Sequence, residues 1–453
     1  MDTQHSVRIH TLSPVRSPIS AHSEQREAAA QQGLAANIDG AGILPASESL
    51  KPFPWPWANG YGTLAHDSLP AFFQPLGCYH VEMPDDVHWS ENLTRILTRW
   101  SGHIDTCQLI LYDDTVALLR LDVVIEVSEA TLAAIVLSGD LDGTLSDSAR
   151  DIYQRLIYPE FQRYCRQFPG SRTEPGPPTD QLKNPNRLEV FKDIRFKENT
   201  GSDSYVLWTG RYILLPRSAL DTPLGEQLCQ WASYGGPHSE LLESGHHVGS
   251  GNILVLSDDS EACRSDWFRG LSLCQFYNAI LSIYGGILKS GYSQLTELIG
   301  TRRGNSRKLN TLMADITRSL DHLEFTRLEF NDARVGVQAD RARIVEDTCT
   351  AWKLDSMIGS ALERTNLIRS RIARLLEERR TQLNRSVELI LFGIGGVALI
   401  DLFISLTMAS RNLEEDAIPG LLDAFRWLPP DGSIAVSSTI LVLVSIYVYL
   451  AKR

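Results

Sequence analysis

The 453-residue sequence lacks a net positive charge, closely spaced cysteines and an apolar N-terminal segment. Its formal net charge of -12 argues against a nucleic-acid partner, because phosphate binding needs clustered Lys and Arg. The 7 cysteines are scattered and never stand two residues apart, which argues against a metal or redox pair and indicates buried thiols in a reducing compartment. Without an apolar signal core, membrane insertion is expected to depend on C-terminal segments.

Proline is absent from residues 354–408, so nothing interrupts a helix there. Apolar or small residues in the first part alternate in steps of four and three, which is typical of a coiled-coil seam that needs partner helices. The seam consists of Leu354, Ile358, Ala361, Thr365, Ile368, Ile372 and Leu375. Residues 387–408 carry almost no charge and match the ~20 residues that cross a bilayer. With a second apolar run at residues 434–450, the pattern predicts a long stalk that joins a two-helix transmembrane hairpin.

Charged residues around the two runs predict their orientation. Basic side chains precede the first run and follow the second, and include Arg369, Arg371, Arg374, Arg379, Arg380, Arg385, Lys452 and Arg453. The loop between the runs is mainly acidic, with Glu414, Glu415, Asp416, Asp423 and Asp431. Because Lys and Arg near span ends stay in the cytoplasm, we expect a multi-pass inner-membrane protein with both termini cytoplasmic.

Asp401 lies within the first predicted span. A carboxylate costs at least ~2.5–3.5 kcal/mol at the bilayer centre, so it is expected to face helices or water. If several copies ring an axis, Asp401 and Ser405 would line a cation pathway, and Glu388 would add a second ring near the cytoplasmic mouth. Gly393 and Gly396 would pack the helices together.

An alternative keeps Asp401 inside a single hairpin. There it would be protonated or hydrogen-bonded to Ser437 or Ser438 of the second span. Charged residues in spans serve structure as well as conduction, so the sequence leaves both readings open.

The rest of the chain predicts an α/β (α+β) cytoplasmic region, with short strand and helix patterns separated by Pro-rich segments. The first residues show no periodicity and are expected to be disordered. We expect the disordered segment at residues 1–58, a first α/β domain at 59–168 and a Pro-rich linker at 169–186. A second α/β region that ends in a long buried helix follows at 187–303, then the helical stalk at 304–386 and the hairpin at 387–453.

The run Asp140-Leu141-Asp142-Gly143-Thr144 resembles the opening motif of haloacid-dehalogenase phosphatases. In that family the first Asp is the nucleophile, the second is the acid-base, and a magnesium ion assists. No lysine stands between Lys197 and Lys289 to neutralise a phospho-aspartate, although Asp258 and Asp259 imitate the late acidic motif. We therefore expect an ordinary surface turn and a protein that is not an enzyme, with phosphatase activity as the alternative.

The layout of α/β region, stalk and two spans resembles the CorA-type superfamily of divalent-cation channels. The resemblance implies a homo-oligomer, usually of five subunits, whose first spans line a pore for a divalent cation, without another cofactor. The family's Gly-Met-Asn triplet after the first span is absent, and Thr407-Met408-Ala409-Ser410 stands there, so magnesium selectivity is not implied. The chain is also similar to the CATRA group of membrane-anchored proteins of bacterial conflict systems, which implies a partner protein and a defence role.

Two classes of function follow from these patterns. In the first, an oligomer in the lipid bilayer forms a regulated pore or permeabilising effector, and the cytoplasmic domains sense a signal. In the second, the hairpin is only an anchor, and the α/β region binds a partner protein.

Overall fold

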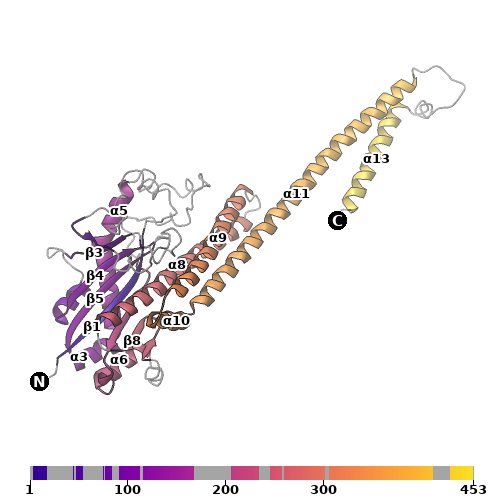
Figure 1. Ribbon diagram of the computed structural model, residues 1–453. Coiled ribbons are helices and arrows are strands. Elements are labelled where there is room, and N and C mark those ends of the chain that lie inside the picture. The colour runs from indigo at the N-terminus through magenta and orange to yellow at the C-terminus, as the bar shows by residue number, and fades with distance from the viewer. Residues whose placement is uncertain are drawn as a thin grey trace. The chain divides into compact units, whose positions relative to one another are not determined.

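The computed structural model describes residues 4–17, 44, 47–54, 75, 77–83, 91–112, 116–167, 206–233, 245–257, 260–300, 306–411 and 429–451. The chain divides into two compact units, Met1–Ser370 and Arg371–Arg453. The first contains a β-sheet and its covering helices, and the second contains two long helices (Figure 1).

The first unit is built on one eight-stranded sheet of order β2-β3-β4-β5-β1-β6-β8-β7. The strands are β1 Gln4–Arg16, β2 Leu50–Pro52, β3 Gly77–Val81, β4 His103–Leu111, β5 Val116–Ser128, β6 Gly210–Leu215, β7 His246–Val248 and β8 Asn252–Leu256. Among these strands only β6 and β8 run parallel. The prediction of two separate α/β regions is wrong, because strands from both belong to this one sheet.

Strand β1 occupies the middle of the sheet and joins its two halves. It pairs with β5 along its whole length, from Gln4 opposite Ser128 to Arg16 opposite Val116, and its middle part also pairs with β6. The prediction that residues 1–58 are disordered is therefore wrong for the residues that form β1 and β2. Successive side chains of a strand point to opposite faces, so β1 contributes to the cores on both sides of the sheet.

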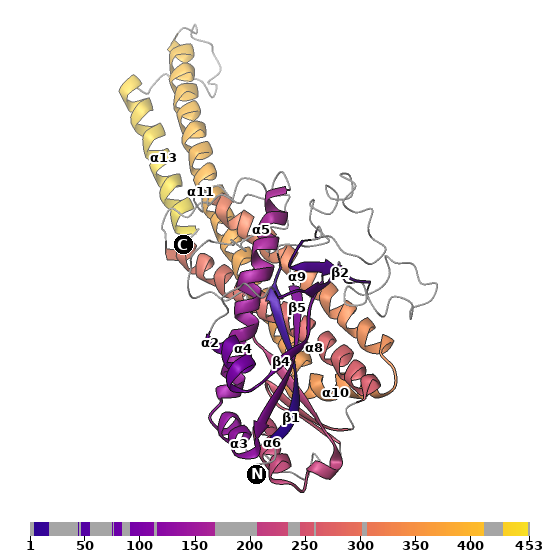
Figure 2. The same ribbon diagram turned by 90° about the vertical axis from the view of Figure 1, so that its left-hand side faces the viewer.

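One face of the sheet carries helices α2 to α6, which Figure 2 shows on the opposite side from α8 to α10. They are α2 Glu91–Thr94, α3 Glu129–Leu137, α4 Asp140–Ile152, α5 Tyr158–Gln167 and α6 Pro223–Ser233. Ile9 of β1 and Leu121 of β5 are fully buried in the same core as Leu141 and Leu145 of α4.

The other face is covered by α8 Glu261–Gly300, which packs on β1 and β5 and is joined by α9 Ser306–Gly336 and α10 Asp340–Trp352. The predicted long buried helix is therefore confirmed. Among the described residues, α8 is one of two helices that are long and apolar enough to cross a membrane, but 72% of its apolar window is buried inside the structure. It is the core helix of this layer.

Helix α11, Leu354–Arg411, begins directly after Lys353, which adopts a left-handed conformation with φ 55°. Within the first unit, the seam residues Leu354, Ile358, Ala361, Thr365 and Ile368 are all buried in the single chain. This part of the seam, which we expect to need partner helices, is therefore covered by the chain itself. Arg334 of α9 binds Asp355 in the first turn of α11, with Nη1 3.0 Å from Oδ1.

The second unit contains the rest of α11 and helix α13, Pro430–Ala451. α11 is the second helix long and apolar enough to cross a membrane, and only 6% of its apolar window is buried. In α13 the apolar stretch found among the described residues is Ile434–Leu443. Both predicted spans are thus helical. Gly396 of α11 lies against the side chain of Leu441 of α13, where an added Cβ would collide with it.

Candidate functional site

The phosphatase-like motif lies on a helix. Asp140 and Asp142 belong to the first turn of α4, which follows Gly139 in a left-handed conformation with φ 75°. The apolar run before the motif is helix α3 rather than a strand. The expectation of a surface turn is therefore wrong, because the motif begins helix α4. Asp258 and Asp259 lie outside the described residues.

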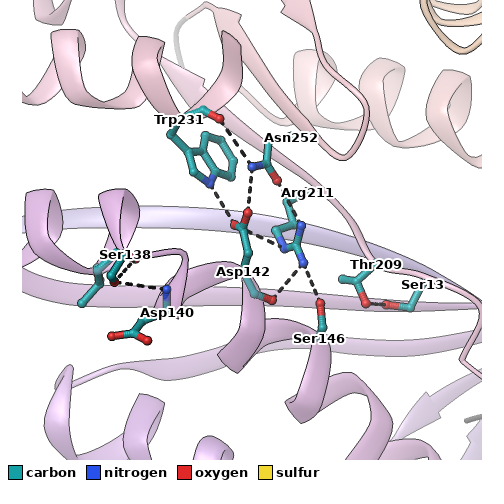
Figure 3. A network of polar contacts seen from close by, with 10 residues as sticks. Ser13, Ser138, Asp140, Asp142, Ser146, Thr209, Arg211, Trp231 and Asn252 are labelled. Atoms are coloured by element: carbon teal, nitrogen blue, oxygen red, sulfur yellow. Dashed lines mark hydrogen bonds and ion pairs between the residues drawn. The ribbon is translucent and has the colours of Figure 1, made fainter. Parts of the chain in front are cut away.

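Asp142 is held by side chains from three other elements (Figure 3). Trp231 Nε1 of α6 donates to one carboxylate oxygen at 2.9 Å, and Asn252 Nδ2 of β8 donates to the other at 2.9 Å. Arg211 of β6 donates from Nη2 to the main-chain oxygen of Asp142 at 2.8 Å and to Ser146 Oγ at 2.6 Å. Both oxygens of the Asp142 carboxylate are thus engaged by the fold.

The geometry around the motif favours a structural role. Figure 3 shows the Asp140 carboxylate turned away from the Asp142 network, so the two carboxylates do not converge on one point. In the described part of the chain, no group of three His, Cys, Asp or Glu residues could hold a metal ion. Asp142 instead ties α4 to α6, β6 and β8, a constellation that local sequence patterns could not reveal.

A second buried polar cluster lies between the sheet and α8. His10 Nδ1 of β1 is 3.0 Å from Asp122 Oδ1 of β5, and Arg120 Nη2 is 2.6 Å from Asp122 Oδ2. The His10 ring stacks on Tyr212 with centroids 4.5 Å apart, and the Arg120 guanidinium lies 4.3 Å from the centroid of Phe268 of α8. Sequence analysis missed this cluster because residues 1–58 were expected to be disordered.

The charge on Asp122 depends on its two neighbours. Burial acts to raise the pKa of this carboxyl, but the contacts with His10 and the charge of Arg120 outweigh it, so the pKa lies below its ordinary value. The carboxylate is only 2% exposed and remains ionised. We interpret the cluster as a buried ion pair that fixes β1 beneath α8, because α8 closes over it.

The third site is a groove on α11 in the second unit. It has a volume of about 610 Å³ and is lined by Ile390, Gly393, Ile394, Val397, Ala398 and Asp401. Asp401 is exposed on this face and makes no hydrogen bond or ion pair with any residue that the structure describes. An ionisable group therefore stands in an otherwise apolar groove within the apolar part of α11.

Asp401 does not face α13. Gly396 lies on the side of α11 that contacts α13. Asp401 follows it by five residues, and since each residue turns an α-helix by about 100°, Asp401 lies about 140° away from Gly396 around the helix axis. Ser437 of α13 donates to the main-chain oxygen of Ile434, 3.2 Å away, in its own helix. The hairpin thus offers Asp401 no serine partner among the described residues.

The other predicted site residues separate into distinct environments. Ser405 is exposed one turn after Asp401, on the same face, and Glu388 is exposed nearer the start of the run. Gly396 packs on α13, whereas the position of Gly393 is open and lines the groove. Exposed arginines before the run are Arg374, Arg380 and Arg385, and Arg379 is half-buried. Lys452 and Arg453 lie outside the described residues.

No family model matches this chain, and no curated protein or solved structure resembles it significantly. The Asp142 network, the Asp122 cluster and the Asp401 groove are therefore interpreted from their own residues.

Proposed function

We propose that this protein is a homo-oligomeric membrane protein in which α11 and α13 form a hairpin and the Asp401 faces of several α11 helices line a cation pathway. One observation carries the proposal: Asp401 is exposed in a groove on the face of α11 that is turned away from α13. A single hairpin would therefore present this carboxylate to lipid.

The energetic argument compares lipid with a neighbouring copy. A carboxylate facing hydrocarbon costs ~2.5–3.5 kcal/mol on insertion scales, and each copy would bear that cost. Several Asp401 faces around a water-filled axis remove the contact with lipid and create an acidic ring, which attracts cations. Gly393 leaves the groove open beside Asp401, so a neighbouring helix could approach closely.

The surroundings of α11 support the same arrangement. The exposed arginines before residue 387 would lie among anionic headgroups, which supports a first unit on the cytoplasmic side of a bacterial inner membrane. This layout resembles CorA-type channels, and the missing Gly-Met-Asn triplet leaves the selected ion open. The similarity to proteins of bacterial conflict systems implies a defence role at the membrane. In that role, the flow of cations through the pathway would be the effect that the protein has on the membrane.

The second candidate function is a membrane anchor that binds a partner protein through the first unit. It is favoured by exposed apolar side chains on one stripe of α9, where Val335 is 83%, Leu328 54% and Phe325 49% exposed. A stripe of this kind is typical of a protein contact surface. In this reading Asp401 is protonated and conducts nothing.

The charge-removing substitution Asp401→Asn tests the proposal, with Asp431→Asn at the exposed start of α13 as the matched control. The full chain is reconstituted in liposomes, and cation flux and oligomer size are measured. Loss of the ring charge should reduce flux by about an order of magnitude without changing oligomer size, while the control conducts normally. Normal flux in a correctly assembled Asp401→Asn protein would remove the main support for a pore, and an inactive wild type would favour the anchor.

A further inference from the structure

Two cysteines that are far apart in the sequence meet in the core of the first unit. Cys274 of α8 and Cys349 of α10 are both buried, and their Sγ atoms are 3.9 Å apart. The Cys274 Sγ atom also lies 3.8 Å from the main-chain oxygen of Val345. The two thiols therefore face each other across the contact between α8 and α10.

A close helix crossing brings the thiols together. At Gly270 an added Cβ would stand 2.7 Å from Ile344 Cγ2 and 3.2 Å from Ile344 Cβ, so only glycine allows the helices to approach this closely. Cys274 follows Gly270 by one turn, and Cys349 follows Val345 by one turn, which places both thiols on the contacting faces. A disulfide bond is about 2.05 Å long, so the sulfur atoms, now 3.9 Å apart, need to approach by about 2 Å.

We propose that Cys274 and Cys349 are a redox-active pair that forms an intramolecular disulfide when hydrogen peroxide reaches the α8–α10 contact. One thiolate attacks the peroxide oxygen and becomes a sulfenic acid as water leaves. The second thiol then displaces the hydroxyl group as a second water. Overall two thiols lose two protons and two electrons, and hydrogen peroxide is reduced to two water molecules.

The surroundings keep the pair reduced until an oxidant arrives. Burial raises the pKa of the Cys274 thiol well above its ordinary value, so the thiol stays protonated and reacts slowly. The nearby charge of Arg334 opposes this shift and favours the thiolate. The reaction is therefore expected to be slow compared with that of an exposed thiolate.

The position of the pair gives the disulfide a mechanical consequence. α10 ends at Trp352, and only Lys353 separates it from α11. Arg334 binds Glu346 of α10 at 2.6 Å and Asp355 of α11 at 3.0 Å, so the same cation joins α9 to both helices. A bond from α8 to α10 would fix the segment that leads directly into α11. This coupling rests on the proposed function, whereas the disulfide does not.

The test uses the full chain in membranes, exposed to hydrogen peroxide and then alkylated and digested. Mass mapping is expected to find the peptides of Cys274 and Cys349 linked, and reduction with dithiothreitol should release them. Cys274→Ser and Cys349→Ser should each abolish the linked peptide, while Cys263→Ser, on the same helix as Cys274, should leave it intact. The proposal would be overturned if the wild-type protein gave no linked peptide, or if either cysteine were linked to a different residue. This result comes from the wild type alone, so it does not require that the variants fold.

Flux measured on the same samples separates this proposal from the proposed function. A linked peptide together with altered cation flux supports both. A linked peptide in a wild type that never conducts supports the disulfide and counts against the pore.

Discussion

Removing the charge of Asp122 is expected to destabilise the first unit strongly. In Asp122→Asn, Arg120 loses the carboxylate 2.6 Å away, although its own side chain is only 18% exposed. His10 loses the same partner and is 1% exposed. Breaking a buried pair by removing one partner costs about 3–5 kcal/mol, because it leaves an uncompensated charge in the interior. Since domains are stable by about 5–15 kcal/mol, the variant should lose a large share of its free energy of unfolding.

The pH dependence of this effect has a definite sign. The pKa of Asp122 is lower in the folded protein than its ordinary value, because the contact with His10 and the charge of Arg120 outweigh burial. A lowered folded-state pKa contributes stability that is fully present above the unfolded-state pKa of about 4, and that is lost as the pH falls towards the folded-state pKa. The difference between wild type and Asp122→Asn should therefore be constant near pH 7 and shrink progressively below about pH 4.

Urea unfolding of the full chain in mild detergent, followed by tryptophan fluorescence, measures this difference, since Trp100, Trp231 and Trp267 are buried in the first unit. The matched control is Asp105→Asn. Asp105 pairs with Arg8 at 3.4 Å, but the two side chains are 40% and 31% exposed, so its loss should cost no more than about 1 kcal/mol. Equal midpoints for the two variants would refute the view that the Asp122 cluster holds β1 in place.

Three further predictions concern the Asp142 network, the membrane topology and the contact between α8 and α10. Asp142→Ala should lower the free energy of unfolding by about 2–4 kcal/mol, because Trp231 and Asn252 lose their carboxylate acceptor and Arg211 loses an ion pair. Asp140→Ala should change it by less than about 0.5 kcal/mol in the same urea assay, and comparable losses would contradict the network. Glu415→Cys should react with an impermeant maleimide added outside intact cells, and labelling only after lysis would reverse the proposed topology. Gly270→Val should separate α8 from α10 and reduce peroxide-induced disulfide formation several-fold on mass mapping, with unchanged formation as the contrary result.

The long helices were predictable because each carries one uninterrupted pattern over many residues. α11 has no proline and a continuous apolar period, and α8 is apolar on nearly every side. Period alone does not say which helix covers an apolar stripe. The seam from Leu354 to Ile368 predicts partner helices without saying where they come from, and the chain itself buries it. The same spacing of apolar residues serves an interchain coiled coil and an intrachain core equally well.

Strand β1 and the Asp142 network could not be predicted, because their stabilising partners are distant in sequence. In β1, Thr11 and Ser13 look like surface residues, but Thr11 donates to the main-chain oxygen of Leu121 at 2.8 Å, and Ser13 bonds Thr209 at 2.9 Å. A polar residue is compatible with a core once its hydrogen bonds are satisfied there. Local composition carries no information about such partners, so this strand resembled a disordered segment.

The central position of β1 also determines when the sheet can close during synthesis. β1 is translated before either of its neighbours, and β6 begins only at Gly210. At about 5–20 residues per second, the ribosome needs roughly 10–40 s to travel from the end of β1 to β6. Throughout that interval one edge of β1 has no native strand to pair with, and exposed edges invite wrong pairing. Codon choice and chaperone access between β5 and β6 should therefore influence the yield of folded protein more than they would in a sheet assembled in chain order.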